Sequence, residues 1–225
     1  MSGSMLTYAV IGGSRAYGLN TESSDTDILR LSNDVLNNRV MPLDNTRTQE
    51  ILIGTNEFLN SINGKYSHVQ RVQLFFPERF LCDNSLTSFV LENREFLIVA
   101  QRPIIYKLFM RQAEYRAGNI DVLYGKFRKR YAYALHHYSM LANYAEGMPF
   151  VQAYRLEGEL QRFCIAIRNN EIPFDEYMNR IAMERRRAEK SASFYDVNID
   201  YKFMFRCYTE ASKLLNKQTN KQTNK

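Results

Sequence analysis

The sequence has few cysteines and no long apolar run. Its three cysteines, Cys82, Cys164 and Cys207, are scattered and lack CxxC spacing, which argues against a zinc site or a disulfide framework. No apolar stretch approaches the roughly 20 residues of a membrane-spanning helix. The first residues do not place a basic region before an apolar one. We therefore expect reduced thiols, no membrane association, no secretion signal and a cytoplasmic location.

The excess of charge of one sign is small. The 30 basic and 24 acidic residues give a net charge of +6 and a pI of about 9.2. This balance suits a polyanionic partner such as nucleic acid or nucleotide, and it equally fits a basic solvated surface. The 225 residues are enough for one large domain or two small ones, each with its own core.

Hydrophobic patterning divides the chain near residue 100. Strands are predicted at residues 7–12, 25–31 and 48–54, a helix at 56–62 and a further extended segment at 69–76. The second half has apolar stripes at helical spacing, which predict helices over 103–109, 127–142, 156–167, 173–192 and 203–214. The tail from Asn216 repeats Asn-Lys-Gln-Thr. It has no apolar residue to bury, which predicts disorder.

The predicted fold class is therefore α+β. Residues 1–100 form a small mixed β-sheet head with flanking helices, residues 101–215 an all-helical C-terminal body, and residues 216–225 a disordered tail.

Two carboxylates and a glycine-serine pair carry the chemistry. Asp25 and Asp27 lie two residues apart on a predicted strand, so both should point to one face. Two carboxylates that close repel unless a cation lies between them, and Mg²⁺ prefers such oxygen ligands together with phosphate oxygens. Gly13 and Ser14 directly follow the first strand. There, a glycine lets phosphate approach the backbone, and N–H groups with the Ser14 hydroxyl can donate to it.

Each motif alone is common on turns and solvated edges, but their occurrence in this order after a strand indicates phosphoryl or nucleotidyl transfer. The stretch GSRAYGLNTESSDTDI resembles the signature of the DNA polymerase β-like nucleotidyltransferases. More narrowly, it resembles a bacterial and phage branch that has been linked to RNA repair by prediction. TNEFLNSINGKYSHVQRVQLFFPERF, RYAYALHHYSMLANYAEG and FCIAIRNNEIPFDEYMNRI extend the similarity over most of residues 7–195.

This resemblance implies an NTP substrate and Mg²⁺, normally two ions, with Mn²⁺ as an alternative. It also implies a third carboxylate on a later strand, for which Glu50 is the candidate and Gln49 the alternative in the inward position. Gln73 stands where the branch has a carboxylate. These departures leave open a catalytically degenerate module that binds nucleotide or RNA.

Other residues are secondary candidates. Arg15 is predicted to contact the triphosphate, and Tyr17 to pack beneath the loop. Two basic runs, which are either solvated helix faces or contacts for a polynucleotide acceptor, are Lys126, Arg128, Lys129 and Arg130, and Arg185, Arg186 and Arg187. His68, His136 and His137 are interpreted as structural. The leading hypothesis is a metal-dependent transfer of a nucleoside monophosphate to a hydroxyl of an RNA 3′ end, a protein or a small molecule.

Overall fold

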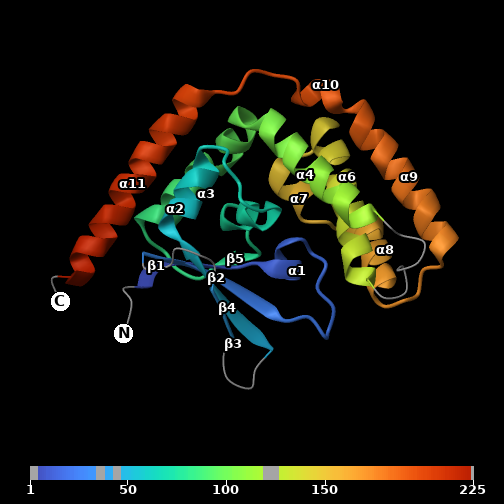
Figure 1. Ribbon diagram of the computed structural model, residues 1–225, viewed down its shortest axis with the longest axis horizontal. Coiled ribbons are helices and arrows are strands. Elements are labelled where there is room, and N and C mark those ends of the chain that lie inside the picture. Colours follow the sequence, from blue (N-terminus) through green and yellow to red (C-terminus); the bar gives the residue numbers. More distant parts are fainter. Residues whose placement is uncertain (1–4, 34–38, 43–46, 119–126, 224–225) are drawn as a thin grey trace. The chain divides into compact units, whose positions relative to one another are not determined.

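The computed structural model describes residues 5–33, 39–42, 47–118 and 127–223. Internal contacts divide the chain into two units (Figure 1). The sheet unit takes its described residues from 1–16, 22–101 and 200–225, and the helical unit from 17–21 and 102–199. The middle segment of the sheet unit ends at residue 101. The last helix joins the sheet unit, and residues 17–21 join the helical unit.

The sheet unit contains a five-stranded mixed sheet in the order β3-β4-β2-β1-β5. Its strands are β1 (Met5–Ile11), β2 (Thr26–Ser32), β3 (Arg39–Pro42), β4 (Thr48–Gly54) and β5 (Arg79–Phe80). Only β2 and β4 pair in parallel; every other neighbouring pair is antiparallel. The three predicted strands and the α+β class are confirmed, whereas the short strands β3 and β5 were not predicted.

Helices accompany this sheet. They are α1 (Gly13–Ala16), α2 (Thr55–Ile62), the 3₁₀ helix η1 (Val69–Leu74), α3 (Ser85–Ala100) and α11 (Tyr201–Thr223). The prediction of an extended segment at 69–76 was wrong. Val69 and Val72 are both fully buried, and a spacing of three places them on one side of a helix with three residues per turn. The His68 ring begins this helix by accepting from the Gln70 N–H at 3.2 Å.

Helix α11 packs along α3, α2 and β1 (Figure 1). Its buried stripe of Met204, Cys207, Ala211 and Leu215 explains why it belongs to the sheet unit. The helix continues through Thr223, so the prediction of disorder from Asn216 was wrong for residues 216–223. Lysine and glutamine are good helix formers, and the Asn33 side chain donates to the Thr219 hydroxyl at 2.8 Å.

The helical unit is built around one central helix, α6. Its helices are α4 (Arg102–Ala117), α6 (Arg128–Ala145), α7 (Phe150–Tyr154), α8 (Gly158–Arg168), α9 (Phe174–Lys190) and α10 (Ala192–Tyr195). Helix α6 packs against α4, α7, α8 and α9 and is buried along most of its length. The predicted helices of this half are confirmed. No helix of the described residues is long and apolar enough to span a bilayer.

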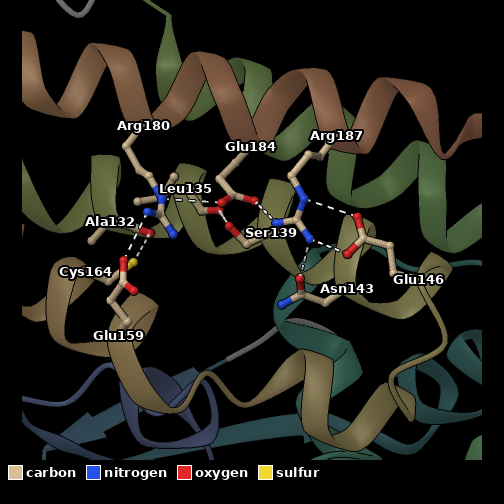
Figure 2. A network of polar contacts seen from close by, with 10 residues as sticks. All are labelled: Ala132, Leu135, Ser139, Asn143, Glu146, Glu159, Cys164, Arg180, Glu184 and Arg187. Atoms are coloured by element: carbon tan, nitrogen blue, oxygen red, sulfur yellow. Dashed lines mark hydrogen bonds and ion pairs between the residues drawn. The ribbon is translucent and has the colours of Figure 1, made fainter.

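A buried ionic network joins α9 to α6 (Figure 2). Glu184, only 1% exposed, pairs with Arg180 at 3.4 Å and with Arg187. Arg187 also pairs with Glu146 and donates to the Asn143 side chain at 3.0 Å. A buried carboxylate is stable only when it is paired and hydrogen-bonded in this way. This arginine therefore holds two helices together.

Candidate active site

The glycine turn after β1 lies directly against Asp27. The Gly12 N–H donates to the Asp27 carbonyl at 2.8 Å. Gly13 has φ +65°, and a Cβ added there would lie 1.8 Å from Asp27 Oδ2. Only glycine can occupy this position, because a side chain would both strain the backbone and displace the carboxylate. The structure thus brings together Gly13 and Asp27, as the two sequence motifs predicted.

Gln73 holds the turn in place. Its side-chain oxygen accepts from the Gly13 N–H at 2.9 Å, and its amide nitrogen donates to the Gly13 carbonyl at 3.0 Å. The side chain is 1% exposed. A carboxylate could accept the first bond but could not donate the second, so this departure from the branch has a structural use. It also means that the Gly13 N–H is already engaged and is not a phosphate donor in this arrangement.

Ser14 and Arg15 follow on the single turn α1. Ser14 is 3% exposed. The Arg15 Nε is buried, with no hydrogen-bond partner among the described residues. A buried guanidinium nitrogen without a partner is costly, and an anionic group of a ligand is one way to satisfy it. Arg15 is therefore placed next to the turn with a donor still available.

The third carboxylate predicted from the sequence is not at the site. In the β2–β4 register Asp27 lies opposite Gln49, and Ile28 opposite Glu50. Glu50 therefore faces the other side of the sheet, where it pairs with Arg30 at 2.6 Å and is 6% exposed. Assigning Glu50 to the metal site was wrong, because a shift of one residue along a strand moves a side chain to the opposite face.

Gln49 takes the position beside Asp27. Its amide nitrogen donates to Asp27 Oδ1. Asp27 is half-buried, and Asp25, two residues earlier, is exposed. Within the described ranges, no three His, Cys, Asp or Glu side chains gather where they could hold a metal. The two carboxylates suit one Mg²⁺ shared with phosphate oxygens. They do not fit the two ions that the resemblance implies.

The first basic run is partly used inside the helical unit. Arg128 donates to the Ile172 carbonyl at 2.8 Å. Arg130 donates to the Arg116 carbonyl at 2.9 Å and lies 4.7 Å from the centre of the Tyr115 ring. Lys129 is exposed, and Lys126 lies outside the described residues. These arginines thus connect helices.

The second run is divided in the same way. Arg187 belongs to the network of Figure 2, and Arg185 pairs with Glu189 at 2.7 Å. Arg186 is exposed, and its Nε donates to the Ala182 carbonyl of its own helix at 3.1 Å. Of this run, Arg186 is the residue whose charge is least engaged by other side chains in the described structure.

His136 is buried in the helical unit and has a structural role. Its Nε2–H donates to the Tyr154 carbonyl at 2.7 Å. Burial lowers the pKa of His136 to about 4, so the ring is neutral near pH 7. Tyr17 is 3% exposed and its ring centre lies 4.6 Å from that of His136. Tyr17 therefore packs, as predicted, but it does so in the helical unit, which no sequence pattern indicated.

The sheet unit is similar to one known family. Residues 6–97, from β1 into α3, match the family model described as "Nucleotidyltransferase domain". This part of the sheet unit is therefore similar to a nucleotidyltransferase domain. A solved structure, a nucleotidyltransferase-like protein from Exiguobacterium sibiricum 255-15, is 14% identical, with a TM-score of 0.32. That alignment covers 84% of this chain and 69% of the other. No curated protein matches the chain.

Proposed function

We propose that the sheet unit binds a nucleoside triphosphate with a divalent cation and transfers its nucleoside monophosphate to an acceptor hydroxyl. The observation that carries this proposal is the contact between the Gly13 backbone and the Asp27 carboxylate. It puts a turn without side chains, which can accommodate phosphate, beside a carboxylate that can hold a cation.

Each residue then has a defined part. Asp25 and Asp27 would hold Mg²⁺ or Mn²⁺ together with the triphosphate. The bound ion supplies charge neutralisation of the phosphates. Arg15, whose Nε is buried without a hydrogen-bond partner in the described structure, contacts the triphosphate. Ser14 donates its hydroxyl. Gln73 keeps the turn in the shape that these contacts need.

The acceptor is proposed to be a hydroxyl at an RNA 3′ end. The net charge of +6 supports a polyanionic acceptor. The internal hydrogen bonds of Arg128 and Arg130 occupy guanidinium N–H groups that could otherwise contact its phosphates. A protein side chain and a small molecule are the alternative acceptors.

A second function, nucleotide binding without transfer, is favoured by Gln49. Where the resemblance implies a carboxylate ligand, an uncharged amide donates to Asp27. An amide NH₂ group cannot bind a cation. A site of this composition can hold a nucleotide with one ion yet lack the charge needed to activate an attacking hydroxyl.

One experiment separates the two functions. The protein is incubated with each of the four NTPs, labelled at the α-phosphate, with Mg²⁺ or Mn²⁺, and with total RNA or cell lysate as acceptor. Pyrophosphate release and label on a macromolecule would support transfer. Binding of α,β-methylene analogues, together with no pyrophosphate release from the four NTPs themselves, would support the second function. Absence of both would contradict the proposal, and Asp27→Asn serves as the inactive control.

A further inference from the structure

The chain leaves the sheet unit in the middle of the candidate site. It does so after Ala16, just beyond the glycine turn, and returns at Glu22, just before Asp25. The five residues between, Tyr17–Thr21, belong to the helical unit; we call them the anchor segment. Both ends of the anchor segment are therefore covalently continuous with residues assigned to nucleotide and cation binding.

Three successive carbonyls of the anchor segment accept hydrogen bonds within the helical unit. The Tyr17 carbonyl accepts from the Leu156 N–H at 3.0 Å. The Gly18 carbonyl accepts from the Gln161 side chain at 2.8 Å. The Leu19 carbonyl accepts from the Arg168 guanidinium. Two of these three donors are side chains on one helix, α8, so the segment depends on the identity of particular residues and not only on backbone pairing.

Packing fixes the same residues. Tyr17 and Leu19 are 3% and 0% exposed. Gly18 has φ +71°, and a Cβ there would lie 2.6 Å from the Leu156 carbonyl oxygen. The close approach that only glycine allows places the backbone within reach of these donors. The anchor segment is thus part of the core of the helical unit.

We propose that Gln161 and Arg168 are positioning residues for nucleotide binding. By holding the anchor segment in one conformation they limit the backbone conformations open to the residues that adjoin it, Ser14 and Arg15 on one side and Asp25 on the other. Ordering a backbone residue costs conformational entropy. A segment ordered in advance spares the nucleotide that cost and so raises its affinity. This inference rests on the proposed binding of NTP by the sheet unit.

The test compares Gln161→Met and Arg168→Met with the full-length wild type. Methionine keeps an unbranched side chain but removes the donors. The probe is the α,β-methylene analogue of ATP or GTP with Mn²⁺, measured by calorimetry well below the melting temperature. We expect each variant to weaken nucleotide binding by up to about fivefold, the factor that corresponds to one hydrogen bond, and the double variant by more.

Two controls separate positioning from general damage. Arg162→Met removes the same charge from an exposed position on α8 and should leave binding unchanged. Arg168→Lys keeps a donor and should restore part of the affinity, which a purely structural loss would not predict. If the wild type binds the analogue and both methionine variants bind it with the same affinity, the inference is overturned and the proposed function stands. Absence of binding by the wild type would instead overturn the proposed function.

Discussion

Asp27 is the residue on which the candidate site depends. Its Oδ2 lies against the Gly13 backbone, its Oδ1 accepts from Gln49, and its carbonyl accepts from Gly12. The backbone contacts fix the position of the side chain independently of any ligand. A change that removes only the charge of this carboxylate should therefore affect ligand binding far more than folding.

Asp25→Asn and Asp27→Asn should each abolish nucleotide-dependent Mn²⁺ binding and any transfer, while leaving the melting temperature equal or higher. The reason is that the cation needs both charges, whereas the fold is relieved of their repulsion. Calorimetric titration with Mn²⁺ and a nucleotide analogue, together with thermal unfolding, measures both. Wild-type Mn²⁺ affinity in either variant would show that the cation binds elsewhere.

Gln49→Glu should raise the affinity for Mn²⁺ by about tenfold or more. The substitution replaces the amide beside Asp27 with a carboxylate of the same shape, and affinity for such cations rises with the number of charged ligands. The measurement is Mn²⁺ titration followed by electron paramagnetic resonance, with the number of ions bound per chain as a second readout. Gln70→Glu, the same change at an exposed residue, is the matched control. Equal affinities in all three proteins would show that Gln49 does not face the cation.

His136 should make the stability of the helical unit depend on pH. Its pKa is about 4 when folded, compared with 6.5 ordinarily, because burial disfavours the charged ring. The unfolded chain therefore binds more protons between these values. The stabilisation linked to a neutral His136 is fully present above pH 6.5. As the pH falls from there toward 4, the free energy of unfolding decreases by about 3 kcal/mol in total.

Thermal unfolding of the wild type and of His136→Gln between pH 7.5 and 4.5 measures this effect. Glutamine can still donate to the Tyr154 carbonyl but does not titrate in this range. The wild type should lose melting temperature on acidification more steeply than the variant. Parallel curves would show that another group dominates.

The spacing of apolar residues correctly predicted those strands and helices that bury one apolar face. Strands β1, β2 and β4 and the helices of the second half have one dominant apolar face, and a pattern of two or 3.6 residues identifies each. Periodicity could not fix the register of β4, because Gln49 and Glu50 are neighbours and both are polar. Only the pairing of β4 with β2 decides which of them faces Asp27.

The remaining misses have other physical causes. Strand β5 has two residues, too short for any pattern, and the apolar residues Val72, Leu74 and Phe76 in and after η1 have the two-residue spacing that also fits a strand. The assignment of α11 to the sheet unit, and of Tyr17 to the helical unit, depends on contacts between residues far apart in sequence. The proximity of Gly13 and Asp27 was predictable, because the glycine turn and the carboxylate pair lie at the ends of neighbouring strands that are close in sequence.

Removal of α11 should unfold the sheet unit. A chain ending at Asp200 would expose the surfaces of α3, α2 and β1 that now bury Met204, Cys207 and Leu215. Burial of apolar side chains contributes roughly 1.5–3 kcal/mol each, so the loss is about 5 kcal/mol or more. A chain ending at Leu215 keeps this stripe and should melt close to the wild type. Circular dichroism melts of the two chains measure the difference, and equal melting temperatures would contradict it.

At the scale of the whole molecule, the net charge of +6 does not describe the charge available to a partner. Arg128 and Arg130 donate to backbone carbonyls, and Arg187 pairs with Glu146 and Glu184. Lys129 and Arg186 are exposed. The two basic runs therefore contain arginines that are engaged within the protein and basic residues that are exposed to solvent. Substitution of the first kind should lower stability, and substitution of the second kind should weaken RNA binding.

Lys129→Gln and Arg186→Gln should weaken binding of a single-stranded RNA oligonucleotide without changing nucleotide affinity. An RNA bound by phosphate contacts releases condensed counterions, so log affinity falls linearly with log salt. Each contact removed should reduce that slope by about one unit. Arg130→Gln should instead lower the melting temperature of the helical unit, because it removes donors that cap the end of α4. Fluorescence anisotropy of labelled RNA from about 50 to 200 mM salt measures the slopes. RNA affinity that is undetectable or insensitive to salt would remove RNA from the acceptors and leave a protein or small-molecule hydroxyl, because no polyanion would then be bound through these charges.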